Sequence, residues 1–358
     1  MTIKPGAIRF NTDSMKLEIF RGSANYEGTA SMAGIGTLAA GQWEEIVATS
    51  PEVQTGGTRG ICAGGFLEPD GDSSNRINVF NISTTGNATD FGDLTQKRYA
   101  LAGVSSRVRG LFAGGRTDPS PTARFNIIDE ITIASTGNAT DYGDLDADQV
   151  SPTGFSNGTR GVFAGGYNPT YTNKIQYVTI AVKENAIDFG DLTDARFGAG
   201  AVSNGTRGII GGGQNPSGVI NTINFVTIST QGDAADFGDL TDARRLSGND
   251  AASNAVRGIF AGGTTPSNTN LIDYITIATL GNAIDFGDLT RRNHYAGTGS
   301  SPTRFVYGGG DDHPSGGNYS NIIDYVQIMS TGDAVDFGDL IQGRRHVKGA
   351  SNGNGGVG

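Results

Sequence analysis

The chain has 358 residues and a formal net charge of -10 at pH 7, which argues against a nucleic-acid-binding surface covering the protein. Glycine accounts for 57 residues and proline for only 11, so the chain is not collagen-like. The single cysteine, Cys62, excludes an internal disulfide framework.

The chain contains no run that approaches about 18 apolar residues, and its first residues contain no apolar signal-peptide segment. We therefore expect no membrane insertion. The product should stay in the cytoplasm in which it is made, or be packaged into a particle assembled there.

Residues 1–57 form a unit of their own that lacks the pattern of the rest. Apolar and polar residues alternate over 6–12 and 15–20 around a short Asp13-Ser14 turn, which predicts a β-hairpin. After a segment rich in Gly, Ala and Ser, residues 43–47 predict a third short strand. Three short strands bury little surface, so we expect this β module to need a neighbouring surface for stability.

One pattern, an Asp-aromatic-Gly-Asp-Leu pentapeptide preceded by a glycine pair, occurs six times between residues 58 and 340. Its aromatic residues, 47 to 51 positions apart, are Phe91, Tyr142, Phe189, Phe237, Phe286 and Phe337. The glycine pairs begin at Gly64, Gly114, Gly165, Gly212, Gly262 and Gly309. A period near 50 without a helical pattern predicts an all-β fold, a six-bladed β-propeller over residues 58–358.

Each unit predicts four strands. In the fifth unit three of these strands are 257–263, 272–278 and 283–289. The fourth, the run of small residues at 295–299, belongs to the next unit. The C-terminal segment 344–352 matches that last strand. We expect it to become the innermost strand of the first blade and to close the ring.

The loops after the glycine pairs differ in length and chemistry, and variable loops on a fixed scaffold usually carry specificity. Four arginines at equivalent positions should lie on the same face, near the central mouth, where they could meet an anionic or sugar ligand. The alternative is that each arginine pairs with an aspartate of a neighbouring DFGDL pentapeptide. The candidate binding residues are Arg98, Arg196, Arg244, Arg344, Tyr167, Tyr171, Asp312, His313 and Tyr319.

No residue set predicts an active site. The DFG triplet of protein kinases occurs here repeatedly on strands, without a catalytic loop or a nucleotide loop. His294, His313 and His346 share no metal-ligand spacing, and the aspartates lack EF-hand spacing. We expect no enzyme activity, no metal and no cofactor.

Two resemblances extend this interpretation. The repeat resembles the kelch repeat, with Phe or Tyr where that family has Trp, so we describe it as kelch-like. The segment GAIRFNTDSMKLEIFRG with QWEEI resembles a small β module of structural proteins of tailed bacteriophages.

The second resemblance implies a virion structural protein, a tail fibre or similar appendage whose propeller contacts a host-surface carbohydrate. Other virion proteins would bind residues 1–57, and the chain could form a homotrimer. The alternatives are a neck or capsid-attached decoration protein, an intracellular kelch-type interaction module, and a propeller enzyme acting on polysaccharide.

Overall fold

The computed structural model describes residues 8–11, 16–21, 42–45, 57–67, 71–118, 123–246, 251–311 and 319–353. The chain divides into two compact units, Met1–Val53 and Gln54–Gly358. No helix in the described ranges is long and apolar enough to cross a membrane.

The first unit contains one antiparallel sheet of three strands in the order β1-β2-β3. Its strands are β1 (Ile8–Asn11), β2 (Lys16–Arg21) and β3 (Gln42–Glu45), with Ile8 opposite Ile19 and Phe20 opposite Trp43.

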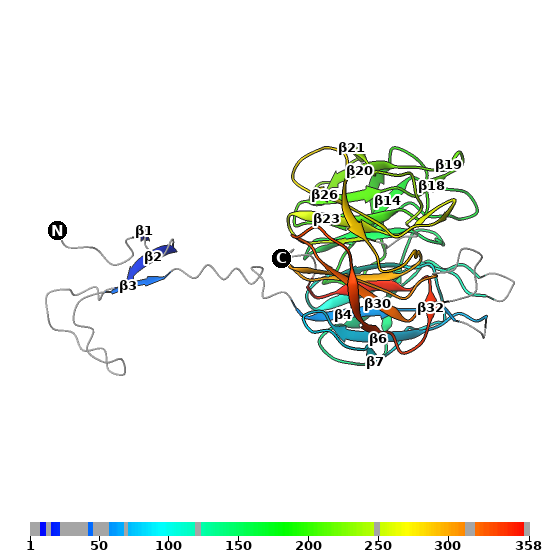
Figure 1. Cartoon of the computed structure of the whole chain (residues 1–358), viewed down its shortest axis with the longest axis horizontal. Helices are drawn as coiled ribbons and strands as arrows, with labels where there is room; N and C mark the ends of the chain where they lie inside the picture. Colours follow the sequence, from blue (N-terminus) through cyan, green and yellow to red (C-terminus); the bar gives the residue numbers. More distant parts are fainter. Residues whose placement is uncertain are drawn as a thin grey trace. The chain divides into compact units, whose positions relative to one another are not determined.

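The second unit is a β-propeller of six four-stranded antiparallel sheets, which confirms the predicted fold class (Figure 1). From the innermost to the outermost strand, the first three blades are β33 (Lys348–Ser351), β4 (Arg59–Ala63), β6 (Arg76–Asn81) and β7 (Thr89–Asp93); β8 (Ala102–Ser105), β9 (Arg109–Ala113), β10 (Ile127–Thr132) and β11 (Thr140–Asp144); and β12 (Thr153–Ser156), β13 (Arg160–Ala164), β14 (Lys174–Thr179) and β15 (Ile187–Asp191). The other three are β16 (Gly200–Ser203), β17 (Arg207–Gly211), β20 (Thr222–Thr227) and β21 (Ala235–Asp239); β22 (Ala251–Ser253), β23 (Arg257–Ala261), β26 (Leu271–Thr276) and β27 (Ile284–Asp288); and β28 (Gly297–Ser300), β29 (Arg304–Gly308), β30 (Ile322–Gln327) and β31 (Val335–Asp339).

Three short strand pairs lie outside the blades. They are β5 (Phe66–Leu67) with β32 (Arg344–Arg345), β18 (Gln214–Asn215) with β19 (Gly218–Val219), and β24 (Thr264–Thr265) with β25 (Ser267–Asn268).

The ring is closed by a strand from the C-terminal end of the chain. β33 pairs with β4 in the register Lys348 opposite Ala63 and Ser351 opposite Gly60. In Figure 1 the red C-terminal segment accordingly lies against the blue β4. The first blade therefore holds strands from both ends of the propeller sequence, and it is complete only when β33 has joined it.

The hydrophobic core lies between the blades, in six clusters that each join adjacent sheets. The aromatic residue of every pentapeptide is only 2–3% exposed. In each blade a β-bulge next to this residue shifts the register, as between Ile128 and Asp129 opposite β11. The bulge directs the aromatic side chain into the core between the blades, while the aspartate that precedes it stays exposed.

The glycine of each pentapeptide allows the next blade to approach closely. These glycines have φ between 144° and 157°, and a Cβ at Gly238 would lie 2.5 Å from the carbonyl oxygen of Gly281 in the following blade. The amide of Gly281 donates to the carbonyl of Phe237 at 2.9 Å. A side chain at Gly238 would separate the two backbones.

Each glycine pair follows the second strand of its blade and lies against the connection that leads to the next blade. Their first members have φ of 62–76° and their second members 97–118°. The amide of Gly65 donates to the carbonyl of Arg98, and a Cβ at Gly64 would lie 2.6 Å from that carbonyl oxygen. The six glycine pairs thus turn the chain at positions where a side chain larger than the hydrogen atom of glycine would not fit.

An arginine at the start of the second strand connects every blade to the next. Its guanidinium donates over 2.8–3.2 Å to an isoleucine carbonyl of the following blade, as Arg304 does to Ile82 across the closure. The six donors are Arg59, Arg109, Arg160, Arg207, Arg257 and Arg304.

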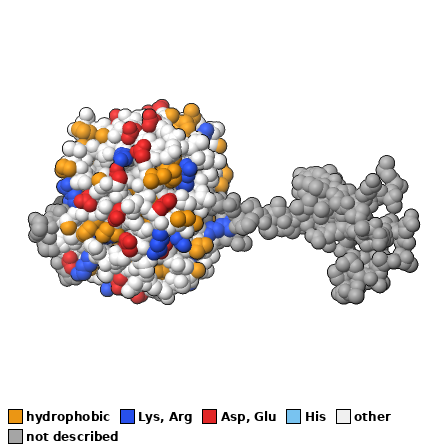
Figure 2. Space-filling view, turned by 180° about the vertical axis from the view of Figure 1, so that it is seen from behind, with side chains coloured by type: hydrophobic (Ala, Val, Ile, Leu, Met, Phe, Trp, Pro, Cys, Tyr) orange, Lys and Arg blue, Asp and Glu red, His pale blue; other side chains and the backbone are white. Residues whose placement is uncertain are grey.

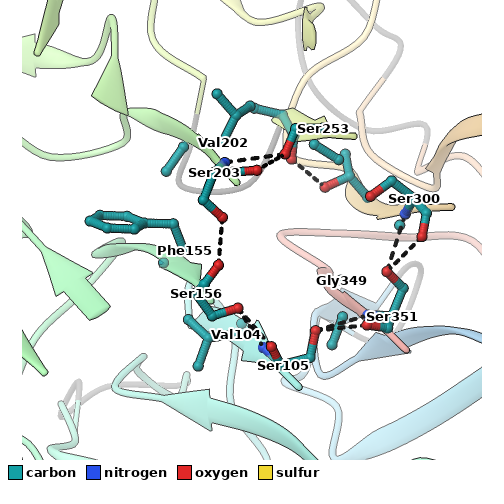
Figure 3. A pocket seen from close by; sticks show the side chains of 18 residues that line it. Val104, Ser105, Phe155, Ser156, Val202, Ser203, Ser253, Ser300, Gly349 and Ser351 are labelled. Carbon is teal, nitrogen blue, oxygen red and sulfur yellow. Dashed lines mark hydrogen bonds between the residues drawn. The ribbon is translucent and has the colours of Figure 1, made fainter. Parts of the chain in front are cut away.

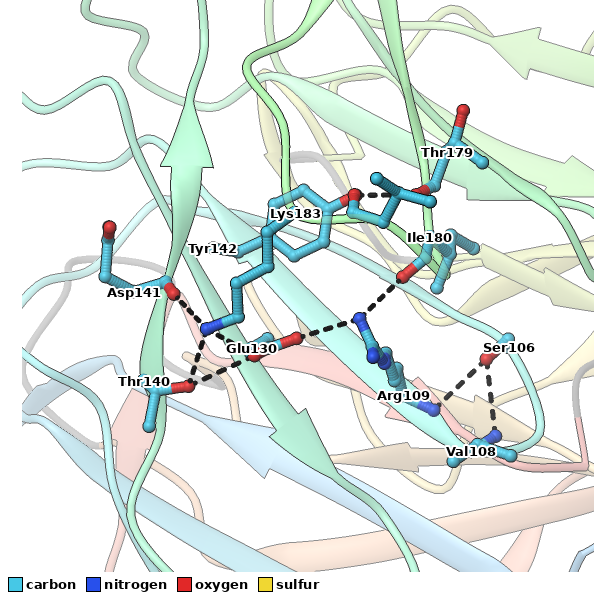
Figure 4. Close-up of polar contacts among 11 residues, drawn as sticks. Ser106, Val108, Arg109, Glu130, Thr140, Asp141, Tyr142, Thr179, Ile180 and Lys183 are labelled. Atoms are coloured by element: carbon cyan, nitrogen blue, oxygen red, sulfur yellow. Dashed lines mark hydrogen bonds and ion pairs between the residues drawn. The ribbon is translucent and has the colours of Figure 1, made fainter.

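The second blade adds charge to this connection, as Figure 4 shows. Arg109 pairs with Glu130 on β10, and Lys183 from the third blade pairs with the same carboxylate at 2.6 Å. In four other blades the arginine lies over an aromatic ring instead, as Arg160 does over Tyr177. Since these contacts recur around the ring, they hold blades together and do not mark one blade as special.

Candidate functional site

The innermost strands begin next to one cavity on the propeller axis and end at another. Figure 3 shows the second of these, a space of about 70 Å³ surrounded by the last residues of the innermost strands. Each blade contributes a serine there: Ser105, Ser156, Ser203, Ser253, Ser300 and Ser351.

These serines connect neighbouring blades around the axis. The Ser156 hydroxyl donates to the Ser105 carbonyl at 2.7 Å, and the Ser105 hydroxyl donates to the Ser351 carbonyl at 2.8 Å across the closure. Equivalent bonds join Ser203 to Ser156, Ser253 to Ser203, and Ser351 to Ser300. Because these hydroxyls are used within the ring, this end of the axis has little to offer a ligand.

At the other end, six short backbone bridges form a rim around the axis. Each bridge joins two equivalent positions of neighbouring blades. The first position directly follows the Arg, Gln or Asn of an interblade connection, and the second directly follows the glycine pair of the next blade. Tyr99 and Arg116, for example, exchange two hydrogen bonds of 2.9 Å. The six bridges are Tyr99–Arg116, Val150–Tyr167, Phe197–Gln214, Arg245–Thr264, His294–Asp311 and Arg345–Phe66. The backbone geometry is thus repeated, whereas the side chains differ from blade to blade.

A pocket of about 360 Å³ opens within this rim, large enough for a small ligand. Aromatic and basic side chains dominate its wall. Its lining residues are Tyr99, Ala100, Arg116, Val150, Ser151, Tyr167, Tyr171, Phe197, Arg245, Tyr295 and His346; below we refer to it as the mouth pocket.

The backbone under the mouth pocket is held in a sparsely populated conformation. Ala100, Ser151, Tyr295 and His346 are the non-glycine residues with positive φ in the described chain, between 50° and 66°, and all four line the pocket. For a bulky residue such as Tyr295 this conformation costs about 1–3 kcal/mol and persists only where surrounding contacts enforce it. Strained residues of this kind are concentrated at functional sites.

Two arginines of the pocket are held by aromatic rings and not by carboxylates. Arg116 lies 4.8 Å from the ring centre of Tyr99, and Arg245 lies 5.5 Å from those of both Phe197 and Tyr295. Arg245 also donates to the Tyr295 hydroxyl at 2.6 Å. No Asp or Glu is among the lining residues, so the pocket is positively charged within an acidic protein.

Three titratable groups at the mouth, His294, His346 and Tyr99, are neutral at pH 7. Burial, followed by Lys348 and nearby arginines, lowers the pKa of His346 well below its ordinary value, and burial lowers the pKa of His294 to about 3. Burial and a hydrogen bond to Asp118 raise the pKa of Tyr99 far above the physiological range. The positive charge of the mouth pocket therefore comes from its arginines.

The prediction that Arg98, Arg196, Arg244 and Arg344 surround the mouth is wrong. All four are among the largest fully buried side chains, at most 1% exposed, so they cannot meet a ligand at the surface. Each lies between two blades: the backbone of Arg98 bonds to the first blade, and its guanidinium donates to the carbonyls of Gly114, Ile127 and Phe112 in the second.

The alternative pairing with DFGDL aspartates is also wrong, because the side-chain partners come from the third strand of the next blade. Arg98 pairs with Asp129 at 2.8 Å and Arg244 with Asp273 at 2.9 Å. In the connections that contain Arg196 and Arg344, the guanidinium instead donates a hydrogen bond to an asparagine side chain, Asn224 and Asn78 respectively. Gln149 and Asn293 occupy the equivalent positions in the remaining connections and are also buried.

Of the other predicted binding residues, Tyr167 and Tyr171 line the mouth pocket with ring centres 5.6 Å apart. Tyr319 lies at the rim, where the guanidinium of Arg345 is 4.8 Å from its ring centre. Asp312 and His313 lie outside the described residues.

Sequence reasoning missed Tyr99, Arg116, Phe197, Arg245, Tyr295 and His346. Tyr295 was expected in an innermost strand, but β28 begins at Gly297, which leaves Tyr295 at the mouth. The available signal was the position after each connecting Arg, Gln or Asn, where residue type varies while neighbouring positions repeat.

Outside the mouth, acidic, basic and apolar side chains are interspersed over the face shown in Figure 2. Within the described residues no group of three or more His, Cys, Asp or Glu side chains is placed to hold a metal ion. No family model matches the chain, and no curated protein sequence matches it.

Proposed function

We propose that the chain is a bacteriophage virion structural protein, a tail fibre or similar appendage, whose kelch-like propeller binds a host-surface carbohydrate at the mouth pocket. Residues 1–57 would attach it to other virion proteins. The virion assignment is supported by the resemblance of the N-terminal segment to phage β modules.

One observation carries the binding role: the rim repeats the same backbone bridge six times with different side chains around a single pocket. A purely structural repeat would have no need for this variation at positions where the backbone is constant. Strained backbone at Ala100, Ser151, Tyr295 and His346 beneath the pocket further supports a site shaped for a ligand.

The test is binding of the labelled full-length chain to bacterial host cells and to the extracted surface polysaccharide. Tyr171→Ala removes a pocket wall and should reduce binding at least about tenfold, the loss expected when a ring that stacks on a ligand is deleted. Val182→Ala, at a 54% exposed residue in a blade turn, is the matched control and should bind like the wild type. Absence of binding to host cells and polysaccharide would contradict the receptor role.

A second candidate is an intracellular interaction module that binds an acidic peptide. The arginines of the mouth pocket favour this role as much as they favour an anionic carbohydrate. Assembly separates the two candidates: sedimentation of the full chain as a trimer, or as a complex with other virion proteins, supports the appendage, whereas a monomer that binds acidic peptides supports the module.

A further inference from the structure

We propose that the mouth pocket takes a single carboxylated sugar residue of a surface polysaccharide, with Arg116 and Arg245 receiving the carboxylate and the aromatic wall contacting the sugar ring. This inference rests on the proposed carbohydrate-binding function and names the class of sugar.

The charge of the pocket favours a ligand with an anionic group. Arg116 and Arg245 make no ion pair with any residue that the structure describes, although the protein has ten more acidic than basic residues. Arg345, at the rim but outside the pocket lining, is paired with Asp311 at 3.2 Å. The arginines that face the pocket are thus available to a ligand, and the one beside it is not.

The two arginines are also positioned before any ligand arrives. Arg116 is held over Tyr99, and Arg245 is held between Phe197 and Tyr295 by hydrogen bonds to the Tyr295 hydroxyl and, at 3.3 Å, to the side-chain oxygen of Gln214. An arginine fixed in this way loses little side-chain freedom on binding, and its planar donors match the two oxygens of a carboxylate. A carboxylate therefore fits better than a diffuse dipole such as an amide.

The rest of the wall favours a compact ring over a peptide. Tyr167, Tyr171 and Phe197 pack in tilted and edge-to-face arrangements with ring centres 5.4–6.2 Å apart, and all three line the pocket, so the apolar face of a sugar ring can lie against one of them. The backbone amides and carbonyls of the rim are paired with each other in its six bridges. An extended peptide therefore finds no strand edge there to which it could add.

The experiment measures equilibrium binding of the full-length chain to three tetrasaccharides that differ at one residue: glucuronic acid, its methyl ester, and glucose. The fourth probe is an acidic hexapeptide with the same net charge as the glucuronic acid tetrasaccharide. We expect the acid to bind at least about tenfold more tightly than the ester or the glucose form, and to lose affinity as salt is raised. These comparisons use the unaltered protein and do not depend on the folding of a variant.

Variants then locate the carboxylate. Arg116→Gln and Arg245→Gln should each weaken binding of the acid at least about tenfold and leave the ester within about twofold, whereas Arg345→Gln should change neither. Equal binding of the three sugars, stronger binding of the peptide, or no saccharide binding would each overturn the inference. If the protein still binds host cells in that case, the receptor role stands and only the sugar class is wrong. If the protein binds the glucuronic acid saccharide but not host cells, only the receptor role fails.

Discussion

The guanidinium of Arg344 donates a hydrogen bond of 2.7 Å to the Oδ1 of Asn78, so that a residue near the C-terminal end of the propeller is fixed inside its first blade. The same group donates to the carbonyls of Gly64, Arg76 and Cys62. Burial lowers the pKa of Arg344 to about 10, which leaves it charged at neutral pH. Arg344 therefore holds the closure together with the strand β33.

Arg344→Ala should loosen the closure and expose the only cysteine. Each orphaned buried acceptor costs about 1–3 kcal/mol, and water can fill part of the space, so we expect a loss of about 3 kcal/mol in the free energy of unfolding. Cys62 lies on β4 opposite Gly349 of β33, and burial raises its pKa to about 11. The native thiol should thus react slowly with a thiol reagent, and faster in the variant.

Arg196→Ala is the matched control, because Arg196 joins the third and fourth blades, which are contiguous in the chain. It should lower the urea midpoint by a similar amount without accelerating the reaction of Cys62. Equal acceleration in both variants would mean that Arg344 has no particular role in closure.

The buried pair Arg244–Asp273 should be strongly coupled. Arg244→Gln leaves the Asp273 carboxylate buried without its cation, and breaking such a pair costs about 3–5 kcal/mol. The double variant Arg244→Gln, Asp273→Gln places glutamine at both positions, as Gln149 and Gln176 stand buried at the equivalent positions before and within the third blade, so it should recover most of that loss. Additive losses in urea denaturation, with no recovery in the double variant, would contradict the coupling.

Gly238→Ala should be more destabilising than Gly281→Ala, although both glycines have φ of 149°. A Cβ at Gly238 would lie 2.5 Å from the carbonyl oxygen of Gly281, whereas a Cβ at Gly281 meets nothing within 4 Å. The backbone strain is shared, so the difference between the two unfolding free energies isolates the crowding, which we expect to cost about 1–3 kcal/mol. Equal losses would show that the close approach of the blades is not what requires glycine.

The histidines at the mouth should make stability depend on pH. The folded protein holds His294 and His346 neutral, while the unfolded chain protonates them near pH 6.5. Below pH 6.5 the unfolded state therefore binds more protons. The free energy of unfolding should fall from pH 6.5 toward about 3, by up to about 1.4 kcal/mol per pH unit for each histidine, and should be unaffected by them above 6.5.

The variant His294→Gln, His346→Gln should reduce this slope in urea titrations between pH 4 and 6.5 (roughly the range in which only the unfolded histidines titrate). The aspartates contribute equally to both proteins and cancel in the comparison. An unchanged slope would show that the histidines are protonated in the folded state.

The sequence already determined the fold, because a propeller is specified by local and repeated requirements. Six copies of a pentapeptide with one buried aromatic residue, and six glycine pairs, are sufficient to count the blades. The match of the C-terminal segment to the innermost strands also predicted how the ring closes, since a strand without a blade of its own has one vacant place to occupy.

Only the tertiary structure decided which polar residues face the mouth pocket. Arg244 and Arg245 are adjacent in the sequence, yet the first is buried between blades and the second lines the mouth pocket. Likewise Arg116 and Arg245, in different blades, line the same pocket. The repeat specifies each blade and its neighbour, whereas the mouth is formed where all six blades converge, and no local pattern encodes that convergence.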